Sequence, residues 1–459
     1  MEIWEKELKN NLGSAVVDKY KAVTNEISGV PRYVSEYLLG YFCEDEITEE
    51  ALNELHNYLS EHKIDLREKE RFKHTLLVTG ELKIIDKFKV KIDLKTGKIK
   101  TTIPSLGITD ATTTDEVLEK NERLLIDGLW GMGKLELEED NKIRLSDFKS
   151  FQLPDIEVEE LIECRKNFSS EEWLNIMVST MGLNYELYGR REKMILLSRL
   201  IPMVQDNIFM MEFGSPGTGK TYVYENISSY SRVILGSKVS APQLFYNLSS
   251  KQEGLLVQYD ILLFDEIDKI SKTGIDEDVI NKLYQYLASG KFDRGDVEKT
   301  SECGIMMVGN LPRGEFRKNG LLERLLHPSM TKQPFLDRLA GVIPGWELES
   351  LSDPKRAYTK NYGFSADYFS EILHKLRKKD FSYIKSRYEL KNCTIRDIDA
   401  IEKMLYGFIK IIYPDGKLND RELYEILNFS VEYRQFVINQ NYEINKDPKL
   451  MKNIEFEVV

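Results

Sequence analysis

The stretch Phe213-Gly214-Ser215-Pro216-Gly217-Thr218-Gly219-Lys220-Thr221 follows the apolar run Ile208–Met211. Its glycines let the backbone turn so that successive N–H groups point at phosphate oxygens. In a loop of this pattern Lys220 reaches the β- and γ-phosphates, and the Thr221 hydroxyl ligates magnesium. The sequence therefore predicts a strand that runs into a phosphate-binding loop, with Gly214–Thr221 binding ATP and Thr221 also binding Mg²⁺.

A second apolar run, within Asp260-Ile261-Leu262-Leu263-Phe264-Asp265-Glu266-Ile267-Asp268, ends in carboxylates. A continuous apolar run is typical of a parallel strand that is covered on both faces. Ligands bind at the carboxyl edge of such sheets, so we expect Asp265 in the magnesium shell and Glu266 to polarise the attacking water. An acidic helix cap after a core strand would explain one of these carboxylates, but not the pair beside a phosphate loop.

A third predicted strand, Gly304–Asn310, ends in a polar residue. Asn310 is the candidate that senses the γ-phosphate and the attacking water. Taken alone, an asparagine at a strand end is more often a turn residue. Its place after the two other strands favours the functional interpretation.

The segment Pro334-Phe335-Leu336-Asp337-Arg338-Leu339 comes next. With it the chain resembles the AAA+ ATPases, and the Leu-Asp-Arg sequence is closest to the Lon branch. The resemblance implies that Arg338 is an arginine finger, which in that family points at the γ-phosphate bound by the neighbouring subunit. The motif by itself would favour a surface arginine paired with Asp337.

Several phrases narrow the resemblance to the BrxL-type AAA+ proteins of bacterial BREX phage-restriction systems. They are Val34–Gly40, Gly219–Tyr224, Leu244–Asn247, Ser289–Gly295, Ile343–Glu347 and Tyr413–Gly416. The resemblance implies an ATPase that assembles into a hexamer or stacked rings. It also implies action on double-stranded DNA, largely independent of base sequence, together with other phage-defence proteins.

The predicted fold is α/β. It combines an AAA+ P-loop NTPase, with a parallel sheet between helices, a helical lid, and an N-terminal α+β domain that contains a barrel resembling an OB fold. The predicted domains are an N-terminal DNA-binding domain at 1–153, an AAA+ large subdomain at 154–350 and a lid with the C-terminal segment at 351–459. In the lid, Arg396 is the expected residue that reaches the nucleotide phosphates.

In the N-terminal domain, lysines alternate with apolar residues along a predicted strand. Lys87, Lys89 and Lys91 are interleaved with Phe88 and Val90. Such a cationic face can contact phosphates, the sequence-independent part of DNA binding. Edge-protecting lysines on a solvated face are an equally weighted alternative from spacing alone, and the family resemblance favours DNA.

A polar hairpin is predicted at 289–300, between the second and third strands of the ATPase. It holds Lys291, Arg294 and Lys299. In DNA-translocating AAA+ rings a hairpin at this place projects into the central pore, so these residues are further DNA-contact candidates. Arg294 could instead serve the neighbouring active site, and a solvated surface hairpin is the ordinary alternative.

The composition is typical of a cytoplasmic protein that does not bind a membrane. The first residues are charged rather than a signal peptide, and no apolar run approaches the roughly 20 residues of a membrane span. The four cysteines are scattered, so neither a disulfide framework nor a zinc site is indicated. The net charge of −12 excludes a protein that is basic overall, but local positive patches suffice to bind DNA.

Two other classes of function stay open. A Lon-like protein unfoldase would usually carry an aromatic pore loop after the second strand, and Gly236–Pro242 has no aromatic residue. A nucleotide-controlled scaffold would use the same phosphate site without sustained turnover. Proteolysis by this chain is not expected, because fuller family members carry a protease-like domain after the lid and the sequence leaves no length for one.

Overall fold

The computed structural model describes residues 2–24, 27–43, 48–65, 67–93, 97–125, 128–139, 141–151, 156–235, 239–249, 251–269, 277–311, 318–350 and 353–459. These residues form two compact units. The barrel unit is Thr24–Asp155, and the sheet unit combines Met1–Val23 with Ile156–Val459.

The first residues of the chain pack in the sheet unit, whereas the sequence-based division assigned them to an N-terminal domain ending at 153. Helix α1 (Ile3–Leu12) buries Trp4 and Leu8. Strand β1 (Val16–Asp18) pairs antiparallel with β16 (Tyr362–Phe364). The boundary differs because this ladder joins segments far apart in sequence, which local patterns do not reveal. The predicted domain boundary at 153 itself falls outside the described residues.

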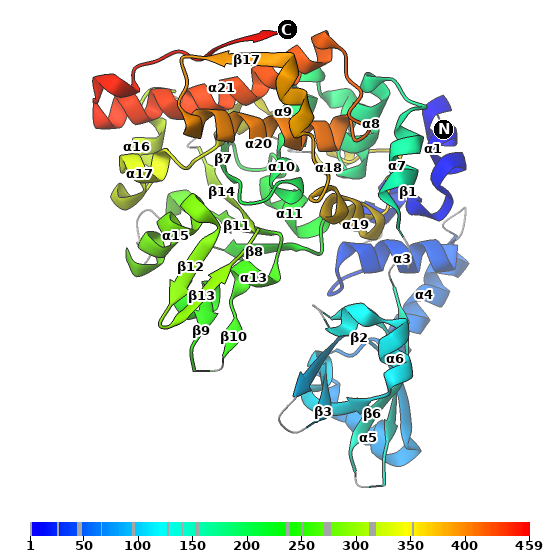
Figure 1. Cartoon of the computed structure of the whole chain (residues 1–459). Coiled ribbons are helices and arrows are strands. Elements are labelled where there is room, and N and C mark those ends of the chain that lie inside the picture. The colour runs from blue at the N-terminus through cyan, green and yellow to red at the C-terminus, as the bar shows by residue number, and fades with distance from the viewer. Residues whose placement is uncertain are drawn as a thin grey trace. The chain divides into compact units, whose positions relative to one another are not determined.

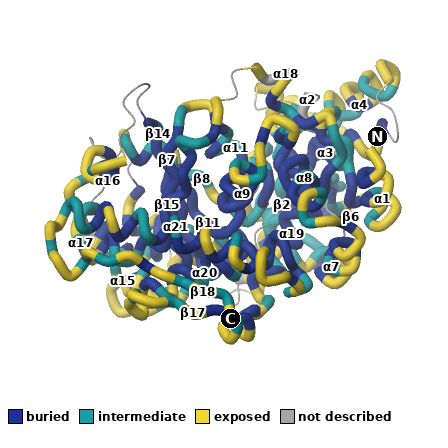
Figure 2. The backbone as a smooth tube through the Cα atoms, turned by 90° about the horizontal axis from the view of Figure 1, so that it is seen from above, coloured by how far each residue is buried: buried dark blue, intermediate teal, exposed yellow. Residues whose placement is uncertain are grey.

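The sheet unit is built on a five-stranded sheet in the order β15-β7-β14-β11-β8 (Figure 1). The strands are β7 (Phe209–Gly214), β8 (Ser231–Leu235), β11 (Ile261–Asp265), β14 (Gly304–Asn310) and β15 (Gly341–Ile343). All neighbours run parallel. Nearly every position of β7, β11 and β14 is buried, as the dark tube of Figure 2 shows. The predicted α/β class with a parallel sheet is therefore confirmed.

Helices and short hairpins accompany this sheet in the sheet unit. The helices up to β15 are α2 (Lys19–Thr24), α7 (Val158–Arg165), α8 (Ser170–Thr180), α9 (Arg190–Ser198), α10 (Ile201–Val204), α11 (Lys220–Asn226), α12 (Ala241–Leu244), α13 (Leu255–Gln258), α15 (Glu277–Ser289), α16 (Leu321–Leu325) and α17 (Gln333–Leu336). The two hairpins are β9 (Tyr246–Asn247) with β10 (Gln252–Glu253) and β12 (Lys291–Arg294) with β13 (Val297–Thr300). Among the described residues, no helix combines the length and apolar character needed to cross a membrane.

The C-terminal part of the sheet unit is largely helical, as predicted. It contains α18 (Pro354–Ala357), α19 (Ala366–Leu376), α20 (Ile395–Ile412) and α21 (Asp420–Asn445). Strand β17 (Tyr388–Lys391), between α19 and α20, pairs with β18 (Glu455–Val458), which follows α21. Capping boxes begin the two longest helices, at Thr394 and Asn419. Helix α21 contacts both α20 and β15, so the helical segment packs directly on the sheet.

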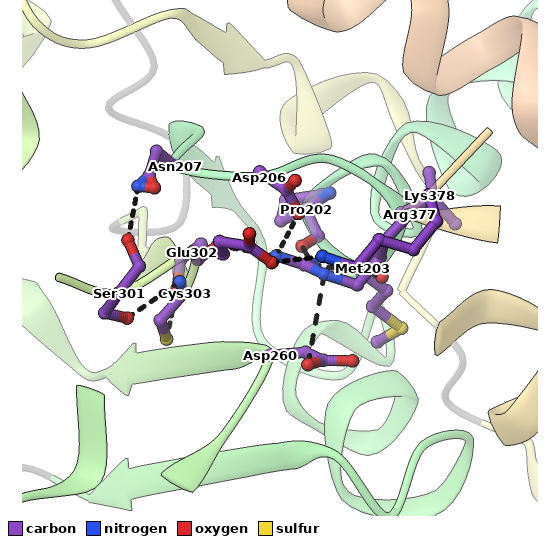
Figure 3. Close-up of polar contacts among 12 residues, drawn as sticks. Pro202, Met203, Asp206, Asn207, Asp260, Ser301, Glu302, Cys303, Arg377 and Lys378 are labelled. Carbon is purple, nitrogen blue, oxygen red and sulfur yellow. Dashed lines mark hydrogen bonds and ion pairs between the residues drawn. The ribbon is translucent and has the colours of Figure 1, made fainter. Parts of the chain in front are cut away.

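Arg377, just after α19, ties this segment to the amino edge of the sheet (Figure 3). Its guanidinium forms an ion pair of 2.7 Å with Asp206, lies 3.9 Å from Asp260 and donates to the Glu302 carbonyl oxygen at 2.5 Å. These three partners precede β7, β11 and β14 respectively. One buried side chain therefore joins the starts of three strands.

Lys410 of α20 lies beside Arg377 and is only 4% exposed. Its ammonium donates to the carbonyl oxygens of Val204 and Arg377, each at 2.9 Å. Burial lowers the pKa of Lys410 from an ordinary 10.5 to about 8, although Asp206 opposes the change. A buried lysine with this pKa costs stability whenever it is protonated in the fold.

The barrel unit contains a closed barrel in the order β2-β3-β4-β6-β5. Its strands are β2 (Glu81–Asp93), β3 (Lys98–Ile103), β4 (Ile108–Thr113), β5 (Leu129–Leu137) and β6 (Ile143–Ser150), and its helices are α3 (Arg32–Cys43), α4 (Glu49–His62), α5 (Lys69–Thr79) and α6 (Asp115–Lys120). Phe88, Val90 and Leu145 lie in the barrel core. The predicted barrel is therefore confirmed, and the structure shows that five strands form it.

The Lys410 site predicts a pH-dependent stability. Between about pH 8 and 10.5 the unfolded chain binds a proton at Lys410 that the folded chain has released. Stability therefore rises with pH across this window, by on the order of 3 kcal/mol for this group. In Lys410→Met the free energy of unfolding, followed by denaturant titration, should lose that part of the rise. A parallel pH profile in parent and variant would contradict the assignment.

Candidate functional site

The carboxyl ends of three parallel strands bring the predicted site together. Asn310, at the end of β14, lies opposite Gly214 at the end of β7. Asp265 ends β11, which pairs with the other side of β14. Because all three strands run in the same direction, their ends meet at one edge of the sheet. The phosphate loop, the carboxylates and Asn310 therefore share that edge.

The loop after β7 has the backbone that its glycines were expected to permit. Gly217 and Gly219 have φ of +79° and +74°, which ordinary side chains disfavour. Gly214 is required for a different reason, because a Cβ there would lie 2.6 Å from the backbone oxygen of Gly345. The Ser350 hydroxyl donates to the Pro216 carbonyl oxygen at 2.8 Å. The segment after β15 thus packs directly against the loop.

Lys220 begins α11 and is buried, with 6% of its surface exposed. Its ammonium donates to the carbonyl oxygens of Gly214 at 3.1 Å and Ser215 at 2.8 Å. Burial lowers the pKa of Lys220, and the nearby Glu212 opposes that effect. A polyanion bound in the loop would therefore both meet this ammonium and favour its charged form.

Thr221 and Asp265 are in direct contact across the sheet edge. The Thr221 hydroxyl donates to the Asp265 carboxylate at 2.7 Å, and the other carboxylate oxygen accepts the Glu266 N–H at 2.7 Å. A hydroxyl and one carboxylate suit Mg²⁺, which completes its octahedral shell with water and substrate phosphates. The two residues predicted to hold the metal therefore fit that role.

Glu266 follows β11 in a left-handed conformation with φ of +54°. This conformation is uncommon for residues other than glycine and stores about 1–3 kcal/mol of strain, a feature of functional sites. The carboxylate forms an ion pair with Lys269, and its side chain is 35% exposed. Glu266 is thus accessible at the site edge, held by a partner that a substrate could displace.

Asp268 connects the ends of two strands. Its carboxylate accepts the backbone N–H of Asn310 at 3.0 Å. The next residue, Leu311, donates its N–H to the Gly214 carbonyl oxygen at 3.1 Å. The position of Asn310 is therefore fixed relative to both the acidic segment and the phosphate loop. The sequence motif contained Asp268, but nothing in the spacing assigned it this function.

Arg338 lies at the opposite edge of the sheet. It precedes β15, and the N–H of Ala340 donates to the oxygen of Phe209, the first residue of β7. The Arg338 guanidinium donates to the Pro334 carbonyl oxygen, while its Nε is shielded from solvent and has no hydrogen-bond partner among the described residues. Arg338 is therefore not brought to the phosphate loop of its own chain.

Arg396 is also placed away from that loop. Its guanidinium pairs with the Asp337 carboxylate at 3.0 Å, beside Arg338. The same carboxylate accepts from Asn441 at 3.0 Å. The start of α20 therefore packs near the amino edge of the sheet, so Arg396 does not reach the phosphate loop of its own chain, and its contact with a nucleotide stays a prediction.

The hairpin β12–β13 carries the other predicted cations. Lys291 pairs with Glu298 at 3.3 Å, and Lys299 pairs with Glu253 of the neighbouring hairpin at 2.9 Å. Arg294 differs, because its Nε and Nη1 are shielded from solvent and lack hydrogen-bond partners in the described part of the chain. Lys299 therefore joins the two hairpins. Arg294 keeps N–H groups that no described residue accepts.

Lys87, Lys89 and Lys91 share the outer face of β2, since Phe88 and Val90 between them are buried in the barrel. Lys91 lies directly opposite Lys100 of β3. Like charges at opposed positions are unfavourable in a ladder. The predicted cationic strip is present in the structure, and its contact with DNA stays a prediction.

Sequence reasoning missed a buried ion pair behind the phosphate loop. Arg199 and Glu212 are each fully buried and approach to 2.6 Å. Arg199 also donates to the Thr218 carbonyl oxygen at 3.0 Å. A charged residue inside the otherwise apolar strand Phe209–Gly214 was the available signal for Glu212. No local pattern identified its partner.

Two family models match the chain. One is described as "Lon-like protease BrxL-like, ATPase domain" and matches residues 143–455. The other is described as "BREX system Lon protease-like protein BrxL N-terminal" and matches residues 11–137. The first contains the sheet and its predicted nucleotide site, and the second contains most of the barrel unit.

Two curated relatives carry the name Lon-like protease BrxL. The protein of Escherichia coli O9:H4 (strain HS) is 32% identical over 427 residues, which are 90% of this chain and 61% of that protein. The protein of Bacillus cereus (strain H3081.97) is 30% identical over 430 residues, 90% of this chain and 63% of that protein. The chain thus spans about three fifths of the length of these relatives. With an ATPase-domain match over most of its residues, this chain belongs to the BrxL family of BREX systems.

Proposed function

We propose that this chain is an AAA+ ATPase that assembles into rings, hydrolyses ATP at subunit interfaces and couples hydrolysis to binding and remodelling double-stranded DNA in phage defence. The observation that carries the proposal is the division of the site between two edges of one sheet. Lys220, Thr221, Asp265, Glu266 and Asn310 share the carboxyl edge. Arg338 lies at the amino edge.

Within one subunit, the described side chains suit binding and water activation. The loop glycines and Lys220 would hold the phosphates, and Thr221 and Asp265 would hold Mg²⁺. Bound there, Mg²⁺ supplies positive charge against the phosphate oxygens. Glu266 would leave Lys269 and accept a hydrogen bond from the attacking water, and Asn310 would orient that water.

The placement of Arg338 supports a shared site. Strand β7 is roughly 16 Å long, at about 3.3 Å per residue. Arg338 lies near its amino end, and the phosphate loop begins at its carboxyl end. Arg338 and Arg294 both keep shielded N–H groups without hydrogen-bond partners in the described residues. Donors in this state are available to a partner from outside the subunit. We assign Arg338 to the phosphates of a neighbouring subunit, with Arg294 as a second candidate.

The barrel unit supports the choice of DNA as substrate. Counted within the barrel, the strands close in the order first, second, third, fifth and fourth. A five-stranded Greek-key barrel of this kind is the OB fold, whose strands bind nucleic acids and oligosaccharides. The lysine strip on β2 adds the positive charge that phosphate contacts require. The hairpin residues Lys291 and Arg294 are further candidate contacts.

Separate substitutions in the site should separate binding from hydrolysis. Glu266→Gln keeps the loop and the metal ligands, so ATP binding should remain while turnover falls at least about a hundredfold. Lys220→Ala removes the buried ammonium and should weaken ATP binding itself. Calorimetric ATP titration and steady-state phosphate release test both. Full turnover by Glu266→Gln would remove Glu266 as the general base.

Mixing variants tests the shared site. Arg338→Ala subunits retain an intact phosphate loop, and Lys220→Ala subunits retain an intact arginine. If Arg338 acts on a neighbour, mixed assemblies should recover part of the ATPase activity that each variant lacks alone. A mixture of Lys220→Ala with Glu266→Gln is the control, because both lesions lie in the same half-site. No recovery at any mixing ratio would contradict action between subunits.

Substrate choice is tested by stimulation of the ATPase. Double-stranded DNA should raise turnover, and the effect should fade with salt. Replacing Lys87, Lys89 and Lys91 by Gln should weaken DNA binding and reduce the salt slope by about 3. The matched control replaces three exposed lysines of the sheet unit, Lys360, Lys417 and Lys446. Stimulation by an unfolded polypeptide alone would favour a Lon-like protein remodeller instead.

A further inference from the structure

The ion pair behind the phosphate loop is unusually well shielded for two charged groups. The Arg199 Nε donates to one Glu212 carboxylate oxygen at 2.9 Å, and Nη2 donates to the other at 2.6 Å. Both side chains are fully buried. Such a pair adds little net stability over apolar residues of similar size. Its presence under the phosphate loop therefore suggests a role other than stability.

The third donor of the same guanidinium reaches the loop backbone. Arg199 Nη1 donates to the Thr218 carbonyl oxygen at 3.0 Å. In a planar trans peptide the C=O and the following N–H point in opposite directions. With the Thr218 carbonyl directed at the buried Arg199, the N–H of Gly219 points to the open side of the loop. That is the side on which phosphate oxygens would be bound.

Gly219 makes this peptide free to turn in the absence of such a contact. Its φ is +74°, and glycine populates positive and negative φ about equally. The peptide between Thr218 and Gly219 could therefore flip and direct its carbonyl oxygen at the phosphates. A hydrogen bond from a charged donor stabilises only one of the two orientations.

The pair is itself held from two further directions. The Tyr224 hydroxyl of α11 donates to the Arg199 carbonyl oxygen at 2.8 Å. On the other side, a Cβ at Gly345 would lie 2.5 Å from the Glu212 carboxylate. The helix after the loop thus holds the Arg199 backbone, and the segment after β15 limits the space around the Glu212 carboxylate.

We propose that Arg199 and Glu212 are positioning residues that hold the Thr218–Gly219 peptide with its N–H turned towards the nucleotide phosphates. Glu212 orients the guanidinium, and Arg199 fixes the peptide. This inference rests on the proposed ATPase function. It assigns the pair an effect on nucleotide affinity that is separate from its contribution to the fold.

A double substitution separates the two contributions. Arg199→Met alone leaves a buried carboxylate uncompensated and should destabilise the fold strongly. Arg199→Met with Glu212→Met removes both charges at similar volume, so the thermal midpoint should return to that of the parent or above. ATP binding should stay weak, with the dissociation constant raised roughly tenfold to a hundredfold. Binding is measured by titrating Mg²⁺ and ATP into full-length protein that carries Glu266→Gln.

The matched control removes another buried pair. Arg32 and Glu36 of α3 approach to 2.9 Å, with side chains 5% and 0% exposed, in the barrel unit. Replacing both by Met should leave ATP affinity unchanged. Parent-like affinity in a folded Arg199→Met/Glu212→Met protein would overturn the inference. Absence of ATP binding by the Glu266→Gln parent would instead overturn the proposed function.

Arg199→Lys covers the case in which the double variant does not fold. Lysine keeps the charge beside Glu212, but a single ammonium cannot reproduce the fork and reach the Thr218 carbonyl as well. The KM for ATP should rise at least about fivefold while kcat at saturating ATP changes less than twofold, since a lost ground-state contact acts on binding. A fall in kcat with unchanged KM, or no change in either, would refute the positioning role.

Discussion

The parallel ladder between β7 and its neighbours is the constraint on which the site depends. Gly214 is paired with Asn310 of β14 on one side, and β15 holds β7 on the other. The strands are buried, so their backbone groups have no solvent to replace a lost ladder bond. A slip of one residue would reverse every side chain of β7 and send Glu212 away from Arg199. Register, rather than any single side chain, therefore sets where the phosphate loop begins.

The same packing explains why three remote segments meet behind the loop. A Cβ at Gly214 would lie 2.6 Å from the Gly345 backbone oxygen, and a Cβ at Gly345 would lie 2.5 Å from the Glu212 carboxylate. Charged groups inside such a contact are costly unless every donor and acceptor is used. Here Glu212 uses both oxygens on Arg199, and the third nitrogen of Arg199 donates to Thr218. The phosphate loop therefore supplies part of the hydrogen bonding that makes the buried charges acceptable.

Local chemistry was predictable from the sequence, and long-range pairing was not. The loop Gly214–Thr221 and the acidic segment ending at Asp265 could be located because each carries its chemistry within a few residues. Strand direction predicts that the two segments lie near each other, and the Thr221 hydroxyl does donate to Asp265. By contrast, the pairing of β1 with β16, the partner of Glu212 and the position of Arg396 depend on packing between distant segments. The place of Arg396 near the start of its helix did not indicate its partner, because the packing around α20 sets Arg396 beside Asp337.

The direction of the strands also limits what one chain can do. A parallel sheet has one edge for all its carboxyl ends, and the phosphate loop occupies that edge. Residues that precede a strand, as Arg338 precedes β15, are necessarily at the other edge. No change in the Arg338 side chain could move its guanidinium the length of β7 to the phosphate loop of the same chain. If Arg338 stabilises charge on a phosphate, that phosphate is bound by another copy of the chain, arranged so that the amino edge of one sheet faces the carboxyl edge of the next. Such head-to-tail contacts are heterologous, and they close into a ring when the rotation between copies permits. Sheet polarity and the position of Arg338 are therefore the observations that support the proposed ring.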